Sequence, residues 1–268
     1  MLKGVIHIHS TYSDGEFTLR DLREVYLDAG CSFAFMTDHA EAFDTAKLDR
    51  YLTECESLSD ENFRFIAGLE FECERRMHVL GLGAPLLAGT TDPQRVIRHI
   101  KNCGGLSVIA HPMDSMFEWI ESFDSLPDGI ETWNSKYDGR YAPRPGTFRL
   151  LNKLQERREG MLAFYGQDMH WRNQYRGLFN IVEGDVEGET LSREALLSSI
   201  GKGRYTAEKD SLHLPSNGRL PRAVLDSFAI AHARSTRRRG WIKTTKRALD
   251  RVGVRVPASV KARLRRIF

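Results

Sequence analysis

Short apolar runs alternate with amphipathic stretches along most of the chain. The runs are rich in β-branched and aromatic residues and are bounded by Gly, Pro or Asp, which is typical of buried strands. They predict strands at residues 4–10, 33–38, 64–73, 77–83, 106–110, 129–133, 161–166 and 179–183. The amphipathic stretches predict helices at residues 18–29, 45–58, 92–103, 145–158 and 192–200. Strands that alternate with helices indicate an α/β fold built on a mostly parallel sheet or on a barrel.

Polar side chains stand at the edges of nearly all these predicted strands. In barrels and parallel sheets the catalytic residues gather at the carboxyl ends of the strands, so these side chains are candidates for one common site. Six of the nine histidines lie at such edges, namely His7, His9, His39, His78, His111 and His170. Asp14, Glu70 and Asp168 lie there too, and Glu131 and Asn134 follow another strand without an assigned role. Of the other histidines, His99 lies in a predicted helix and is interpreted as structural, and His213 and His232 are not expected to be ligands.

A mixture of imidazole and carboxylate groups favours a divalent metal site, because imidazole suits zinc, iron and manganese and carboxylates can bridge two ions. His7 and His9 are two residues apart in a predicted strand, so both side chains should share one face while Ile8 faces the core. Asp168 and His170 repeat this spacing. Neither pair has the spacing of a zinc finger, and no helical His-Glu-x-x-His motif occurs. The ligands must therefore come from distant strands.

The composition is that of a soluble globular protein, with 41% hydrophobic and 28% charged residues. No apolar stretch of eighteen or more residues predicts a membrane span, and the first fifteen residues turn polar too early for a signal peptide. The four cysteines are scattered and form no Cys-x-x-Cys pair, which favours reduced thiols. We therefore expect a cytoplasmic protein.

The net charge of +3 hides two parts of opposite sign. Residues 218–268 carry fifteen basic and two acidic residues, a formal charge of +13, whereas the rest of the chain carries 24 basic and 34 acidic residues, a charge of −10. The acidic part suits multivalent cations and the basic part suits an acidic partner. Because residues 209–221 hold two prolines and a glycine and predict a linker, we divide the chain into a body, residues 1–208, and a basic extension, residues 209–268.

The basic extension predicts three amphipathic helices, at residues 223–234, 241–252 and 258–268. It can dock on the acidic body, lie on an anionic membrane surface through residues 222–268, or hold nucleic acid. The second interpretation places a cytoplasmic protein at the inner face of the membrane. Nucleic acid is the least favoured partner, because few aromatic residues are interleaved with the basic ones. The pattern leaves the oligomeric state open.

Six short motifs resemble, in their order, those of the PHP family, the polymerase and histidinol phosphatase domain. They read HIHSTYSDG, TDH, GLE, HVLGLG, AHP and QDMH, and they run from about residue 3 to about residue 172. The resemblance implies a distorted barrel of seven β/α units, followed here by the basic helical extension. It also implies a trinuclear centre of two or three zinc, manganese or iron ions and the hydrolysis of phosphate esters.

Carried over residue by residue, the resemblance assigns nine ligands to three ion sites, with Glu70 bridging the first and second ions. The sets are His7, His9 and Asp168 for the first ion, His78 and His111 for the second, and Asp14, His39 and His170 for the third. Every position of the trinuclear pattern holds a residue that is able to bind metal. This complete set argues against a PHP domain that has lost its metals.

The expected reaction is the hydrolysis of a phosphomonoester or phosphodiester by a hydroxide that bridges two ions, while the ions neutralise the charge that develops on the phosphoryl oxygens. Its expected catalytic residues are Glu70, His9, Asp14, His170 and Arg172. Asp38 either fixes the His39 imidazole or serves as a loop acid. Two alternatives remain. One is a metal-dependent hydrolase of a non-phosphate ester or amide, and the other is a non-catalytic, metal-stabilised module that binds an acidic surface through its extension.

Recognition of a small phosphorylated substrate favours an arginine beside the metals, because the planar guanidinium matches two phosphate oxygens. Arg172 stands two residues after His170 and is the first candidate. Three weaker candidates are Arg140, Arg144 and Arg176.

Overall fold

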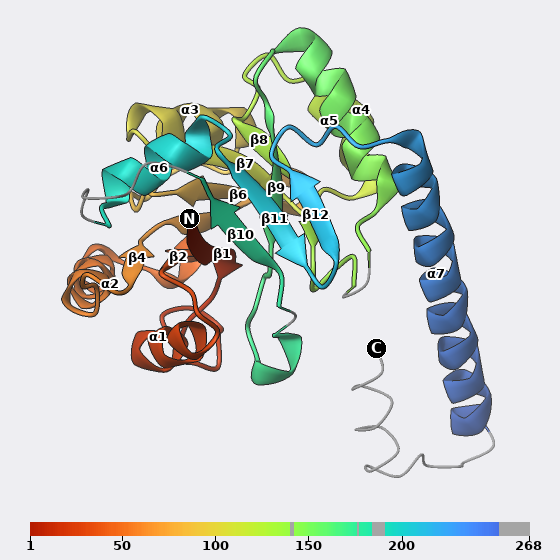
Figure 1. Ribbon diagram of the computed structural model, residues 1–268, viewed down its shortest axis with the longest axis horizontal. Coiled ribbons are helices and arrows are strands. Elements are labelled where there is room, and N and C mark those ends of the chain that lie inside the picture. Colours follow the sequence, from red (N-terminus) through yellow and green to blue (C-terminus); the bar gives the residue numbers. More distant parts are fainter. Residues whose placement is uncertain (140–141, 176, 184–190, 252–268) are drawn as a thin grey trace.

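Two six-stranded sheets make up the centre of the protein (Figure 1). The computed structural model describes residues 1–139, 142–175, 177–183 and 191–251. The first sheet has the order β12-β11-β10-β1-β2-β4, with bounds β1 (Leu2–Ile8), β2 (Phe33–Met36), β4 (Arg64–Ile66), β10 (Phe179–Val182), β11 (Tyr205–Lys209) and β12 (Leu212–Pro215). The second has the order β3-β5-β6-β7-β8-β9, with bounds β3 (Asp38–His39), β5 (Leu69–Cys73), β6 (Met77–Leu82), β7 (Leu106–Ala110), β8 (Gly129–Asn134) and β9 (Leu162–Gly166).

The two sheets join edge to edge into a distorted barrel. Thr37 alone separates β2 from β3, and these two strands pair in parallel with β4 and β5 respectively. At the other seam the chain beyond β9 bonds to β1, because the Gln167 amide donates to the Ile6 carbonyl at 3.0 Å and the Asp168 amide to the His7 carbonyl at 2.7 Å. The strands run parallel around this ring except β6, which is antiparallel to both neighbours. The predicted distorted α/β barrel is confirmed.

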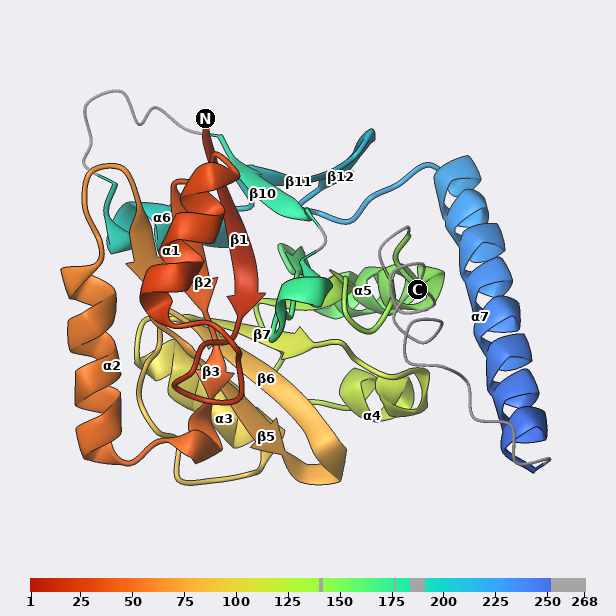
Figure 2. The same ribbon diagram turned by 90° about the horizontal axis from the view of Figure 1, so that it is seen from below.

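Helices cover the outside of the barrel (Figure 2). α3 packs on β6 and β7, α5 on β8 and β9, α2 on β4, and α6 on β4 and β10. The helix bounds are α1 (Leu19–Asp28), α2 (Thr45–Ser57), α3 (Pro93–Asn102), α4 (Phe117–Glu121), α5 (Pro145–Arg157), α6 (Arg193–Gly201) and α7 (Arg222–Arg251). Single 3-10 turns lie at Ala40–Ala42, Glu74–Arg76, Asp114–Met116 and Arg172–Gln174.

All strands and helices predicted before residue 201 correspond to observed elements, with ends that move by one or two residues. The strands predicted at residues 33–38 and 64–73 are each divided in two, into β2 and β3 and into β4 and β5. Three elements were missed, and each is short or lacks an apolar pattern. α4 is five residues long, and β11 alternates polar and buried positions. β12 lies inside the segment predicted as a linker, where its backbone pairs antiparallel with β11. The linker prediction is therefore wrong for residues 209–215, and the first sheet continues to Pro215.

From Arg222 the basic extension forms one continuous helix, α7, where we predicted two helices with a break. No proline interrupts the predicted break, and a single glycine such as Gly240 costs a helix only about 1 kcal/mol. Figure 1 shows α7 beside α5, and the Phe228 ring of α7 is 3% exposed and lies 6.4 Å from the Phe148 ring of α5. The helix predicted at residues 258–268 lies outside the described residues.

Over the described residues, the helices are too short or too polar to span a lipid bilayer. Docking of the extension on an anionic membrane or on nucleic acid stays a prediction.

We predict that Phe228→Ala detaches α7 from α5, because removing a buried phenyl group costs about 3 kcal/mol. Hydrogen exchange of the α7 amides near residue 228 should then be about 100-fold faster. Ile230→Ala is the matched control, since Ile230 lies on the same helix and is 54% exposed. Equal exchange rates in the two variants would contradict this packing.

Candidate metal centre

The nine predicted ligands converge at one end of the barrel. Four groups of their side chains have ligand atoms within 4.8 Å of one another. The groups are His9, Asp14, His39 and His170; His7, His9 and Asp168; His7, Glu70 and His111; and His39, Glu70 and His78. The groups overlap through shared members, so the side chains form one continuous cluster.

The carboxylate of Glu70 lies at the middle of the cluster and is 1% exposed. Its Oε1 lies 2.8 Å from His78 Nδ1 and 3.2 Å from His111 Nε2. Its Oε2 lies 3.2 Å from His9 Nε2 and 3.4 Å from His7 Nε2. The two oxygens thus face different pairs of imidazoles, which is the arrangement that a bridging carboxylate requires.

Asp14 forms the outer side of the cluster and is more than half exposed. Its Oδ1 lies 3.3 Å from His170 Nε2 and 3.6 Å from His39 Nε2. The other nitrogen of His39, Nδ1, lies 3.4 Å from Glu70 Oε2. His39 therefore joins the third predicted ligand set to the bridging carboxylate, a link that the resemblance did not include.

Three of the predicted ligands have a left-handed backbone, with φ of 66° at His7, 30° at His111 and 53° at Asp168. This conformation costs a residue other than glycine about 1–2 kcal/mol, and such strain is concentrated at functional sites. The register between β1 and β2 shifts at His7, so this residue is a bulge and β1 ends one residue before His9. The His7 and His9 rings do lie together, with their centres 5.2 Å apart. The bulge, and not the alternation of side chains along a regular strand, brings them there.

β8 supplies two residues to which the sequence analysis gave no role. Glu131 Oε1 lies 2.7 Å from His7 Nδ1, and its Oε2 accepts from the His111 amide at 2.8 Å. Asn134 donates through Nδ2 to Asp168 Oδ2 at 3.1 Å. By occupying Nδ1, Glu131 fixes the His7 ring so that Nε2 faces the cluster. The pattern of polar residues after a strand marked both positions, but it could not separate a supporting residue from a ligand.

Lys136 was missed entirely, and it places an ammonium group among the predicted ligands. Its Nζ lies 3.0 Å from Asp168 Oδ1 and 3.2 Å from His170 Nδ1. It therefore partly neutralises the buried carboxylate of Asp168. The residue lies two positions beyond β8, in a loop whose path carries no signal in the sequence.

Asp38 orders the loop that carries Asp14. Its Oδ1 accepts from the Ser10 amide at 2.8 Å and from Ser13 Oγ at 2.7 Å, and its Oδ2 accepts from Ser10 Oγ at 2.9 Å. Of the two roles considered for Asp38, the structure therefore favours the loop acid over a partner of the His39 imidazole.

The two arginine candidates that the structure describes, Arg172 and Arg144, have partners outside the nine predicted ligands. Arg172 is exposed, and its guanidinium lies 5.1 Å from the centre of the Phe17 ring. Arg144 forms an ion pair with the buried carboxylate of Asp138. Arg172 begins the 3-10 turn Arg172–Gln174, and its contact with a substrate stays a prediction. Arg140 and Arg176 lie outside the described residues.

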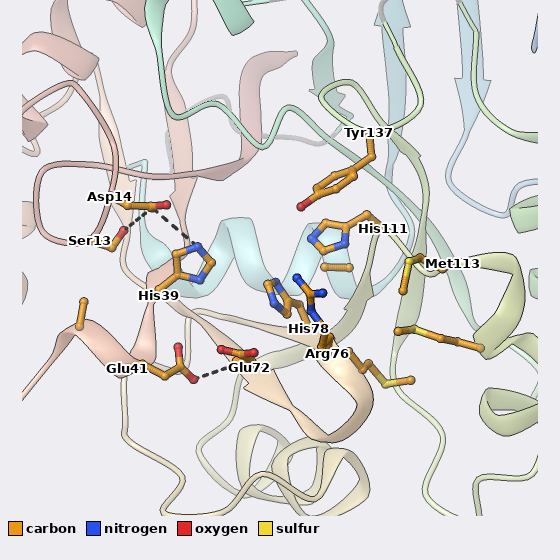
Figure 3. A pocket seen from close by; sticks show the side chains of 14 residues that line it. Ser13, Asp14, His39, Glu41, Glu72, Arg76, His78, His111, Met113 and Tyr137 are labelled. Carbon is orange, nitrogen blue, oxygen red and sulfur yellow. Dashed lines mark hydrogen bonds and ion pairs between the residues drawn. The ribbon is translucent and has the colours of Figure 1, made fainter. Parts of the chain in front are cut away.

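A cavity of about 700 Å³ opens over the outer ligands His39, His78 and His111 (Figure 3). This volume is in the range of small-molecule sites. One side is acidic and polar, and the other is largely apolar. The polar side holds Ser13, Asp14, Glu41 and Glu72, and the apolar side holds Met77, Ala110, Met113, Met116 and Tyr137.

Three buried nitrogens of the cluster have no hydrogen-bond partner among the described residues, namely His7 Nε2 and both ring nitrogens of His9. Leaving a buried polar atom unpaired costs about 1–3 kcal/mol, so such atoms are rare in native proteins. All three face carboxylate oxygens at 3.2–3.8 Å, a separation that suits two ligands of the same cation. The donor set therefore fits divalent metal ions.

The charges of the cluster shift several pKa values. Burial lowers the pKa of His7, but the carboxylates of Glu131, Asp168 and Glu70 outweigh it and raise that pKa well above its usual value. Burial takes the pKa of His9 down to about 3, against the opposing effect of Glu70. Burial raises the pKa of Glu70, but the charge of His7 and hydrogen bonds from the surrounding imidazoles hold it well below its usual value.

These shifts predict that metal binding releases protons. The raised pKa of His7 favours its protonated form, and a cation must displace that proton, so the apparent affinity for Mn²⁺ should rise with pH until the raised pKa of His7 is passed. Titration calorimetry in buffers of different ionisation enthalpy measures the number of protons released. Affinity independent of pH between about 6 and 8 would contradict this charge arrangement.

We predict that Gly166→Ala weakens metal binding about 10- to 100-fold, the usual loss when the partner of a ligand is displaced. A Cβ at this position would lie 1.8 Å from Glu131 Oε1, so the carboxylate would have to leave His7. Gly146→Ala is the control, because its Cβ would meet nothing closer than 3.2 Å. Mn²⁺ titration of both variants checks the prediction, and equal affinities would remove Glu131 from the metal site.

No family model matches the chain. Among curated proteins, the DNA polymerase/3'-5' exonuclease PolX of Bacillus subtilis is 33% identical over 79 residues, which cover 26% of this chain and 14% of that protein. The chain thus corresponds to a small part of this relative.

Solved structures share the fold at low sequence identity. A two-domain protein from Bacteroides vulgatus, containing a predicted PHP-like metal-dependent phosphoesterase, is 16% identical with a TM-score of 0.52, over 80% of this chain and 66% of that one. An amidohydrolase from Chromobacterium violaceum with bound sulfate and no metal is 15% identical with a TM-score of 0.50, over 72% and 96%. The chain therefore has the fold of the PHP-like proteins, and the resemblance that its motifs predicted is confirmed.

Proposed function

We propose that this protein is a cytoplasmic metal-dependent phosphoesterase that hydrolyses a phosphomonoester or phosphodiester of a small substrate. The observation that carries the proposal is the buried carboxylate of Glu70, whose two oxygens face different imidazoles while nitrogens of His7 and His9 have no hydrogen-bond partner in the described part of the chain. A structural core would satisfy these groups internally. Their arrangement instead leaves room for cations.

The nine clustered side chains would hold two or three divalent ions. His7, His9 and Asp168 form one group in the structure, and Glu70 links it to His78 and His111. Asp14 lies with His39 and His170 at the more exposed side, which suits a third ion with open coordination positions. Zinc, manganese and iron all accept such mixed nitrogen and oxygen ligands.

Bound there, the ions supply Lewis acidity toward phosphoryl oxygens and lower the pKa of a water molecule toward neutrality. The chain itself holds the ligands in place. Glu131 fixes the His7 ring, and Asp38 ties down the loop that carries Asp14. The cavity opens on the outer ligands, so an ester that enters it meets the cluster directly (Figure 3).

The Bacteroides protein of the same fold, described as containing a PHP-like metal-dependent phosphoesterase, supports the choice of a phosphate ester. The amidohydrolase from Chromobacterium violaceum has the same fold, which keeps amide or carboxyl ester hydrolysis as the alternative. p-Nitrophenyl phosphate, its bis ester, p-nitrophenyl acetate and p-nitroacetanilide share the p-nitrophenyl group and cover these bonds. Turnover of the acetate or the anilide alone would overturn the proposal.

We expect chelation to abolish hydrolysis of the two phosphate esters, and Mn²⁺ or Zn²⁺ to restore it. His9→Ala and Glu70→Ala should each lower kcat/KM more than about 1,000-fold, because each removes a ligand of the shared centre. Glu74→Ala is the control, since Glu74 is exposed and lies outside the four ligand groups. Circular dichroism tests whether the variants stay folded. Full activity of either ligand variant would remove the metal mechanism.

A further inference from the structure

Arg76 is the single arginine or lysine among the described residues that line the cavity. The other charged side chains there are Asp14, Glu41 and Glu72, together with three imidazoles. Figure 3 shows the guanidinium of Arg76 beside His78 and directed toward His111. The described lining of the cavity therefore holds one permanently charged cation, near the predicted ligands His78 and His111.

The Arg76 side chain is exposed. Its guanidinium has no partner in the part of the chain that the structure describes, although acidic residues line the same cavity. The neighbouring arginine differs, because the Arg75 guanidinium lies 4.5 Å from the centre of the Trp119 ring. Arg172 likewise packs on Phe17. Arg76 thus offers a planar set of donors that is free for a ligand.

The turn between β5 and β6 separates these two arginines. Both Arg75 and Arg76 have left-handed backbones, with φ of 56° and 61°. Glycine would adopt this conformation without steric strain, whereas an arginine backbone is strained in it. The turn is fixed by the pairing of Cys73 with Met77, so the strained backbone aims Arg76 into the cavity while Arg75 packs outside on Trp119.

Part of the wall of the same cavity is apolar and aromatic. Tyr137 and Met113 are 51% and 48% exposed, so both are open to contact with a ligand. The Tyr137 ring lies 4.3 Å from the His111 ring at an angle of 34°, so it is held against a predicted ligand. The cavity therefore offers a cation directed toward His111 and an exposed ring packed against the same imidazole.

We propose that Arg76 and Tyr137 form the substrate subsite, in which Arg76 binds an anionic group of a phosphate ester and Tyr137 packs on a flat or apolar leaving group. The inference rests on the proposed function, because it names the part of the substrate that these residues hold. The anionic group is either the reacting phosphate or a second anion on the leaving group. Both are bound by the same bidentate chemistry.

Binding of two phosphonates to the Mn²⁺-loaded protein tests the subsite without any turnover. Phenylphosphonate carries the ring and one phosphoryl group, and 4-carboxyphenylphosphonate adds a second anion. Arg76→Gln should weaken binding about 10- to 100-fold, the range for lost hydrogen bonds to a charged group. Loss with both compounds identifies the phosphoryl group as the partner, and loss confined to the carboxylated compound identifies the second anion. Unchanged binding of both compounds overturns the proposal.

Arg75→Gln is the matched control, because it removes the same charge from the same turn without touching the cavity. It should leave both affinities within about twofold, and an equal loss in the two variants would reduce the effect to overall charge and overturn the proposal. Arg76→Gly separates binding from folding. It should lose binding like Arg76→Gln while its melting temperature stays at or above that of the parent, because glycine relieves the left-handed strain.

Tyr137→Ala tests the second half of the subsite. It should weaken phenylphosphonate about tenfold, the value of a lost ring contact, and leave methylphosphonate binding within about twofold. Equal losses for the phenyl and methyl compounds would overturn the packing role of Tyr137. Since none of these measurements needs catalysis, a protein that binds phosphonates through Arg76 but hydrolyses no phosphate ester would refute the proposed function and leave the subsite intact.

Discussion

The contact on which the site depends is that of one buried carboxylate with the imidazoles around it. Glu70 is almost fully buried, and an isolated ionised carboxylate is very costly in such a place. Histidines from β1, β3, β6 and β7, or from the residues just after these strands, come within 3.4 Å of its two oxygens. The charge is thus compensated by groups from strands far apart in sequence. This requirement links the closure of the barrel to the assembly of the metal centre.

The strained backbones at His7, His111 and Asp168 follow from the same constraint. Regular strands direct alternate side chains to opposite faces and would not bring these ligands to one point. A bulge at His7 and left-handed residues at the ends of two other strands turn the side chains inward. The packing of the barrel, with its many fully buried aromatic and aliphatic side chains, offsets this local cost.

The ligands could be predicted from the sequence because residues able to bind metal stand directly after, or at the ends of, short apolar runs. A histidine directly after an apolar run, such as His111 after β7, is visible without a structure. Glu131 was visible in the same way, but only the 2.7 Å contact to His7 shows that it orients a ligand. Lys136 and Arg76 had no such signal, since a loop path and a left-handed turn place them. The same holds for Arg172, whose guanidinium packs on the Phe17 ring. Closeness along the chain says little about side-chain direction.

β6 is antiparallel to its two neighbours in the barrel, β5 and β7. The first residues of β6, rather than its last, lie at the metal centre, so the hairpin before it lines the cavity. Insertions or deletions in this hairpin would reshape the entrance while the register of Glu70 and His78 stays fixed by the ladder behind it. Substrate preference can therefore evolve at the hairpin tip independently of ion binding.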